Sequence, residues 1–183
     1  MGLLRRQLSP CSRDVKTKAY EALVRPKLEY ASQIWNPNTL KDIKRIEQVQ
    51  RNAARFVFAD YRKTSSVTPL INQLDWDTLH TRRLIHQATM FYRIHYGLVN
   101  ISPPACFQRA THIFRFDHPL KYVSTFRPVV NVYRFAFYPR VVQIWNRLPP
   151  SAVLHINPTT TAFQDYAIPA IRDMKPLGEN NMV

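Results

Sequence analysis

The sequence predicts a mainly α-helical protein: a helical bundle, followed by a Pro- and aromatic-rich region with one or two short strands and further short helices. Three observations carry this prediction. Only 3 of 183 residues are glycine, where ordinary usage of about 7% would give roughly a dozen, and tight β-hairpins favour glycine. The 14 prolines are typical of helices with firm ends. Apolar residues recur at spacings of three and four, and at 45% of the chain they suffice for a folded core.

The glycine content also excludes several classes of enzyme. The three glycines are Gly2, Gly97 and Gly178, and no two lie close together. A dinucleotide-binding fingerprint, a Walker-type phosphate loop and a nucleophile elbow each need closely spaced glycines. We therefore expect none of these sites.

The first predicted segment, residues 1–63, carries most of the charge. It holds 14 Lys+Arg against 6 Asp+Glu, a net charge of +8 out of +14 for the chain. A basic excess of this size favours polyanionic partners, nucleic acid first and acidic membrane second.

Residues 12–37 predict two helical pieces separated by a proline. Ser12 is a suitable N-cap, and Asp14 suits the positive end of a helix dipole. The expected apolar face of the first piece consists of Val15, Ala19, Ala22 and Leu23. Pro26 should kink or end it. A second piece is expected to run through Tyr30, Ala31, Ile34 and Trp35 and to stop before Pro37.

The clearest predicted helix runs from Thr39 to Phe58. Its apolar stripe contains Ile43, Ile46, Ala53 and Val57, at helical spacing once Gln50 is included. The opposite side is basic, and Asp42 and Glu47 fall outside it; it consists of Lys41, Lys44, Arg45, Gln48, Arg51, Asn52 and Arg55. This side is either a polyanion-binding face or a plain solvated face, although a solvated face usually mixes both signs of charge.

The second segment, residues 64–100, is expected to be a buried helical segment packing on the first. Thr68 and Pro69 open a short helix through Leu74, and Asp75-x-Asp77 resembles a helix cap. A long helix from Thr78 to Tyr96 follows, with Gly97 in the C′ position. Arg82 and Arg93 lie on its polar strip with His86; both arginines are expected at the rim, although a phosphate contact is the alternative.

The third segment, residues 101–173, is mixed, and a frayed tail is expected at 174–183. Alternation within Val129–Phe137 indicates one or two strands. A helix is predicted from Phe137 through Trp145, ended at Leu148-Pro149-Pro150. A last amphipathic helix containing Phe163 and Tyr166 should stop before Pro169.

The chain shows no constellation typical of catalysis or of a cofactor. It has no Asp-Asp pair for a two-metal site. Cys106, His112 and His118 have a spacing wider than zinc pairs usually show. Cys11 has no histidine nearby in sequence. With two cysteines and no long apolar run, we expect an intracellular protein, cytoplasmic or nuclear, that is not secreted and has no membrane partner.

Several blocks of the sequence, in order, resemble non-LTR, LINE-type (jockey-like) retrotransposon reverse transcriptases, in the region after the polymerase palm. The similar blocks are Gly2–Arg6, Leu23–Ser32 (LVRPKLEYAS), Trp35–Pro37, Ile46–Val57 (IEQVQRNAARFV), Ser65–Thr68, the Arg82-Arg83 helix with Tyr96–Val99, Phe137–Arg140 and Trp145–Pro149. The resemblance extends to about Tyr166. It implies a C-terminal piece, thumb and post-thumb, of a longer polyprotein whose endonuclease, fingers and palm are missing.

The resemblance implies a non-catalytic protein with a thumb-like first segment. Thumbs of related polymerases grip the template–primer duplex, so the expected partners are RNA or RNA–DNA duplex backbone and a reverse-transcriptase palm domain. The best candidates for phosphate contacts are Lys44, Gln48, Arg51 and Arg55, followed by Arg5, Arg6, Lys16, Lys18, Arg62 and Lys63. The alternatives are a helical docking module whose apolar faces contact a partner protein, or a decayed reading frame without activity.

Overall fold

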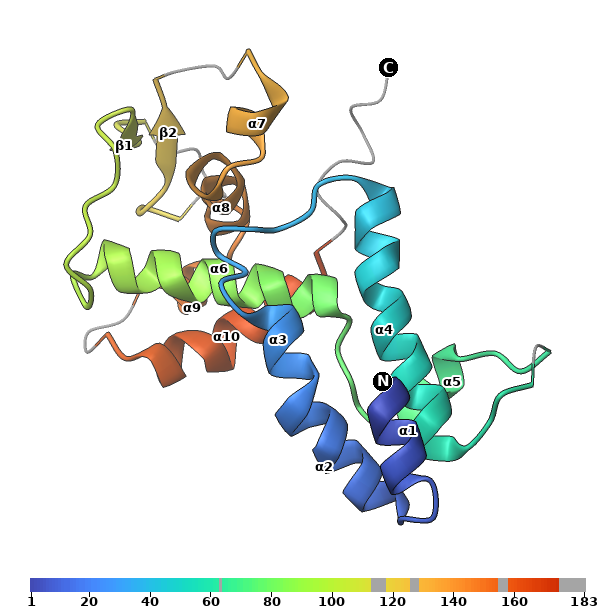
Figure 1. Ribbon diagram of the computed structural model, residues 1–183. Coiled ribbons are helices and arrows are strands. Elements are labelled where there is room, and N and C mark those ends of the chain that lie inside the picture. Colours follow the sequence, from blue (N-terminus) through green and yellow to red (C-terminus); the bar gives the residue numbers. More distant parts are fainter. Residues whose placement is uncertain (63, 113–117, 126–128, 155–157, 175–183) are drawn as a thin grey trace. The chain divides into compact units, whose positions relative to one another are not determined.

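The chain is mainly helical, and its described residues contain one small antiparallel sheet, in line with the predicted fold class (Figure 1). The computed structural model describes residues 1–62, 64–112, 118–125, 129–154 and 158–174. The chain divides into two units, 1–83 and 84–183. The division falls within the helix Leu79–His95 and inside the segment 64–100.

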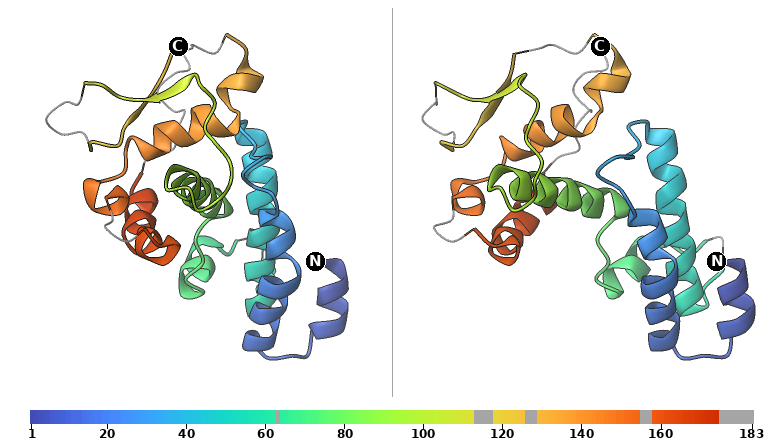
Figure 2. Two further views of the ribbon diagram at one scale, coloured as in Figure 1. Left: turned by 90° about the vertical axis from the view of Figure 1, so that its left-hand side faces the viewer. Right: turned by 60° about the vertical axis from the view of Figure 1, so that its left-hand side comes forward.

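The first unit is built on two long antiparallel helices. It contains α1 (Gly2–Leu8), α2 (Arg13–Leu23), α3 (Arg25–Glu29), α4 (Leu40–Phe58), α5 (Thr68–Gln73) and the first turn of α6 (Leu79–His95). The start of α2 meets the end of α4, because Arg13 lies over the Phe58 ring and Tyr20 reaches back to Gln50. Both views of Figure 2 show α2 alongside the C-terminal half of α4.

Helix α2 begins where the sequence predicts, but it buries a different face. The Ser12 hydroxyl accepts a hydrogen bond from the Val15 amide at 3.5 Å, which confirms the N-cap. Val15 and Leu23, however, are exposed, and the buried side chains are Lys16 and Tyr20. The predicted face is therefore wrong by one residue, about 100° around the helix. Tyr20 carries more apolar surface than the alanines on the predicted face, and its packing sets the rotation.

The second predicted helical piece ends earlier than expected. Helix α3 starts at Arg25, takes Pro26 into its first turn and ends at Glu29. Residues 30–34 form turns in which Ala31 has a φ of 49°, so the prediction of a helix through Trp35 is wrong. A left-handed residue interrupts the helical hydrogen-bond ladder.

The starts of α5 and α6 agree only in part with the prediction. The short helix α5 forms at Pro69 as predicted. The cap of α6, however, is Thr78, whose hydroxyl accepts from the Thr81 amide at 3.1 Å, so the Asp75-x-Asp77 cap is wrong.

Polar side chains share the core of the first unit with apolar ones. The buried apolar residues are Tyr20, Ala53, Ala54, Phe56, Val57, Val67 and Leu79, and the buried polar residues are Lys16, Ser32, Gln50 and Arg83.

The second unit packs the rest of α6 between α8 and the α9–α10 pair (Figure 2). Its elements are β1 (Phe107–Arg109), β2 (Tyr122–Ser124), α7 (Asn131–Arg134), α8 (Phe137–Trp145), α9 (Pro150–Val153) and α10 (Thr160–Arg172). In the sheet Phe107 pairs with Ser124 and Arg109 with Tyr122. Gly97, at a φ of 67°, ends α6 with a bond from the Leu98 amide to the Arg93 carbonyl, which confirms the predicted C′ glycine.

Two predictions for this unit are wrong in position. The stretch Val129–Phe137 contains the helix α7 and the first residue of α8, and the described strands lie elsewhere. Helix α10 continues past Pro169 to Arg172. Pro169 itself is exposed, while Ala167 and Ile171 on either side of it are buried, so packing of the next turn outweighs the helix bond that the proline removes. Of the predicted tail, only Met174 lies within the described residues.

The core of the second unit is aromatic. Trp145 has no exposed surface, and its ring lies 5.1 Å from Phe91 and 6.3 Å from Phe163, measured between centroids. Its indole nitrogen donates to the Leu120 carbonyl at 2.7 Å. His118 is buried beside it and is satisfied at both ring nitrogens: Nε2 lies 3.0 Å from the Trp145 carbonyl, and Nδ1 accepts from the Leu120 amide at 3.2 Å.

Candidate nucleic-acid interface

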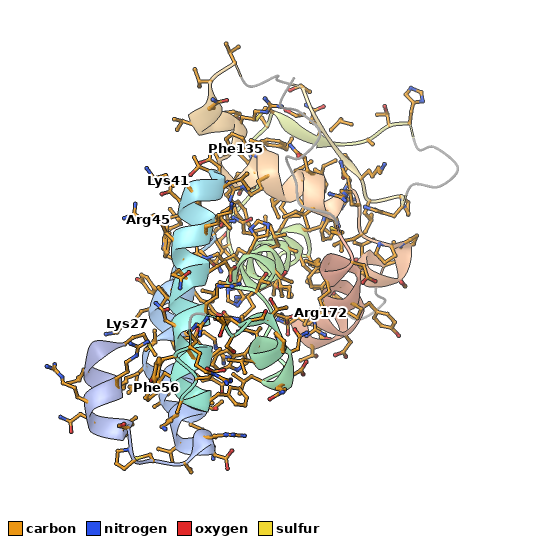
Figure 3. All side chains as sticks on the ribbon, turned by 90° about the vertical axis from the view of Figure 1, so that its right-hand side faces the viewer. Lys27, Lys41, Arg45, Phe56, Phe135 and Arg172 are labelled. Carbon is orange, nitrogen blue, oxygen red and sulfur yellow. The ribbon has the colours of Figure 1, made fainter. Side chains whose placement is uncertain are left out.

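Helix α4 presents a continuous basic face to solvent. We call it the α4 outer face; it consists of Lys41, Lys44, Arg45, Gln48 and Arg51, all exposed. At about 100° per residue these side chains occupy an arc of roughly 120° centred opposite Gln50. Figure 3 shows Lys41 and Arg45 at the outward edge of the helix. The basic stripe predicted from the sequence therefore faces away from the core of its unit.

The rotation of α4 is set by a buried amide. The Gln50 Nε2 donates to the Asp77 carbonyl at 2.9 Å, and its Oε1 lies 3.5 Å from the Tyr20 hydroxyl. A buried amide without such partners would cost several kcal/mol. These bonds therefore hold Gln50 inward and the basic residues outward.

The two carboxylates of α4 lie off the outer face. Asp42 forms the N-terminal cap with Thr39: its amide donates to the Thr39 hydroxyl at 3.2 Å, and its carboxylate accepts from that hydroxyl at 2.6 Å. Glu47 points inward and accepts from the His80 amide at 2.8 Å. Burial raises the pKa of Glu47. The weak 3.8 Å contact from Arg45 to Asp42 is exposed, so it offsets little of the positive charge.

Arg55 is placed differently from the other α4 cations. Its guanidinium donates to the backbone carbonyls of Asp60, Arg62 and Ser65, at 3.1, 2.8 and 2.9 Å. These bonds hold the loop that follows α4, where Ala59 ends the helix at a φ of 55°. Its donors are thus occupied by the loop rather than presented with the outer face.

Arg62 is also engaged within this loop. Its Nε lies 3.0 Å from the Asp60 carboxylate, which also accepts from the Ser65 hydroxyl at 2.5 Å. The hydrogen bonds from Arg62 and Ser65 lower the pKa of Asp60, and the same carboxylate raises the pKa of Arg62. Lys63, the next candidate, lies outside the described residues.

The candidates on α1 and α2 are dispersed. Arg6 and Lys18 are exposed, and Arg5 is exposed with its guanidinium 4.9 Å from the centre of the Tyr61 ring. Lys16 is only 7% exposed, with its ammonium 5.5 Å from the centre of the Phe56 ring. The Lys16 side chain therefore packs between α2 and α4 and is not presented to solvent.

Arg82 and Arg93, the two arginines predicted on the polar strip of α6, differ in their surroundings. Arg82 is half-buried and forms a bidentate pair with Glu29, with a 3.2 Å bond from its second nitrogen. This carboxylate raises the pKa of Arg82. Arg93 is exposed.

No metal-binding cluster of three His, Cys, Asp or Glu side chains occurs among the described residues. Cys106 lies with its sulfur 3.5 Å from the Tyr133 hydroxyl, and both nitrogens of His118 are used as described above. Every helix in the described ranges is too short or too polar to cross a membrane.

The sequence placed Lys41 and Arg45 on the basic side without ranking them as contacts, and the structure shows both exposed beside Lys44 and Arg51. Their helical spacing was the available signal. Comparison of the chain with protein-family models, with curated proteins and with solved structures found no match.

Proposed function

We propose that this chain is a non-catalytic protein that binds the phosphate backbone of a nucleic-acid duplex, RNA or RNA–DNA, without sequence preference. The observation that carries the proposal is the α4 outer face, where four exposed cations stand opposite a buried Gln50 and the helix's carboxylates are turned away. Contacts of this kind position a protein on nucleic acid but do not read bases.

The dimensions of the face suit this role. Lys41 and Arg51 are ten residues apart, about 15 Å along the helix axis. Along one strand of B-DNA, successive phosphates rise by about 3.4 Å, which sets the order of magnitude for the spacing in other duplexes. Long, flexible cationic side chains over this length can therefore reach several phosphates at once.

The proposal includes an origin in a non-LTR reverse transcriptase. The similar block Ile46–Val57 falls entirely on α4, so the resemblance and the charge distribution support the same element. On this proposal the chain corresponds to the thumb and post-thumb region, and a palm domain is the partner that supplies the metal-binding carboxylates for polymerisation.

The test is a salt titration with the full chain and a fluorescent RNA–DNA hybrid. Four engaged cations give a slope of log K against log salt of about −3.5. Replacing Lys44 and Arg51 by Gln should reduce the magnitude of that slope by about 2. The original candidate Arg55 is unsuitable as a binding variant, because its replacement would release the loop it holds.

The matched control is Arg93→Gln with Arg134→Gln. These are exposed helix cations of the second unit, so the control removes the same net charge from elsewhere in the chain. We expect it to leave the slope nearly unchanged. Equal weakening by both pairs would contradict the proposal and make the α4 outer face a plain solvated face, as the docking-module alternative requires.

A further inference from the structure

The loop between α3 and α4 exposes an unusual set of large side chains. Tyr30 is 77% exposed, Ile34 is 86% exposed and Trp35 is 42% exposed. The loop follows α3 and leads directly to the start of α4 (Figure 1). Three large exposed side chains within six residues make this loop a candidate contact surface.

Trp35 is held firmly despite its exposure. Its indole nitrogen donates to the Tyr30 carbonyl at 2.5 Å. The Arg83 guanidinium lies 4.0 Å from the centre of its ring. Arg83 is itself only 1% exposed and is anchored by the carbonyls of Trp35, at 3.3 Å, and of Leu28. The orientation of the indole is therefore set before any ligand binds.

This arrangement suits a planar ligand. A guanidinium 4.0 Å from the ring centre occupies one face of the indole, so the exposed area belongs to the rest of the ring. Any of the nucleic-acid bases can stack on an exposed aromatic ring, because every base has a π-face. A ring fixed in advance loses little conformational freedom when a base stacks on it.

The charge around the loop favours a polyanion over a protein partner. Lys27 on α3 is exposed, and Figure 3 shows it on the same side of α4 as Lys41 and Arg45. The nearest carboxylate in sequence, Glu29, is engaged by Arg82.

The loop also packs on α4. Asn36 and Pro37 line one small cavity with Ile43 and Ile46, on the apolar side of α4 opposite the outer face, so a strand lying on the loop would reach the outer face around the start of the helix. Trp35 precedes α4 by five residues, at most about 18 Å of chain.

We propose that Tyr30 and Trp35 form a stacking platform for unpaired bases of single-stranded nucleic acid, whose phosphates continue onto the α4 outer face. This inference rests on the proposed function and extends it from duplex backbone to the unpaired nucleotides beside a duplex. Single-strand-binding proteins combine the same two features, aromatic stacking and a basic track for the backbone.

The experiment compares two oligonucleotides of equal charge. The full chain is titrated with oligothymidylate of roughly twelve nucleotides and with an abasic strand of the same length. We expect the wild type to bind oligothymidylate about tenfold more tightly, which is the size of effect that one or two stacked bases produce. Tyr30→Ala should remove most of this preference, with the affinity for the abasic strand and the salt slope unchanged, and Tyr30→Phe should retain it.

Ile34→Ala is the matched control, because Ile34 is at least as exposed as Tyr30 but has no ring. It should keep the tenfold preference. Equal wild-type affinity for the two strands would overturn the platform, as would equal effects of Ile34→Ala and Tyr30→Ala; the second result would indicate a general apolar contact with a protein.

The two proposals fail in different ways. If the wild type binds the hybrid and the abasic strand with the expected salt slope but shows no preference for bases, only the stacking platform is wrong. If it binds neither the hybrid nor the abasic strand, the proposed function is wrong, and the platform falls with it.

Discussion

The two units of this chain are stabilised by different means. In the first, polar side chains hold backbone segments in place: Gln50 binds the carbonyl of Asp77, Arg83 that of Trp35, and Arg55 three carbonyls of the loop after α4. In the second, α6, α8 and α10 meet around Trp145 and Phe163, and the buried rings do most of the packing.

The two units therefore expose their aromatic and basic side chains differently. The second unit uses its rings inside its core, so its exposed cations are scattered. The first unit buries few rings and leaves Tyr30 and Trp35 exposed in the loop that precedes α4. Side-chain bonds to carbonyls fix the loops there, so the surface is ordered without a large apolar core.

The largest expected effect is on the aromatic core. Trp145→Ala should reduce the free energy of unfolding by about 4 kcal/mol, because it removes a fully buried ring and leaves a cavity. Urea denaturation of the full chain measures the loss. Val132→Ala, at an exposed apolar position of α7, is the control and should change stability by less than about 0.5 kcal/mol. Similar losses for both variants would contradict the picture of a core centred on Trp145.

The next largest expected effect is a loss of stability of the second unit at acidic pH. His95 lies 2.8 Å from the Tyr122 hydroxyl. Burial, with smaller contributions from Arg109 and His118, lowers the pKa of His95 from 6.5 to about 4. The unfolded chain therefore binds the proton more readily. Stability is retained above about pH 6.5 and is lost progressively as the pH falls towards 4.

Urea midpoints at pH 7 and pH 4 measure this loss. His95→Asn removes the titrating group and should make the difference between the two midpoints smaller. An unchanged difference would assign the acid sensitivity to other groups.

The smallest expected effect is at the C-terminal end of α4, in the first unit. Ala59 ends α4 in the left-handed region, where a Cβ is disfavoured and glycine is not. Ala59→Gly should raise the free energy of unfolding by up to about 1 kcal/mol and leave nucleic-acid affinity unchanged. Thermal denaturation measures the gain. Ala54→Gly, inside α4, is the control and should destabilise by a similar amount or more; a loss for Ala59→Gly would mean that the Arg55 loop does not fix this backbone.

Local sequence signals by themselves determined the helical class, the Ser12 cap, the Gly97 terminus and the basic stripe of α4. These depend on hydrogen bonds and periodicities within a few residues, which any tertiary arrangement must respect. Helix α2 is the contrast: its apolar spacing predicted a face through Val15 and Leu23, but the packing of Tyr20 near Gln50 buries a different face.

Only the tertiary structure decided which cations remain available. Arg55 has the same helical spacing as Arg51, yet its donors meet carbonyls of a loop up to ten residues away, while Arg51 stays in solvent. Lys16 is buried over Phe56, and Trp35 is fixed by Arg83, which lies 48 residues further along the chain. Such contacts join residues distant in sequence, and no local periodicity records them, because they depend on how the helices pack.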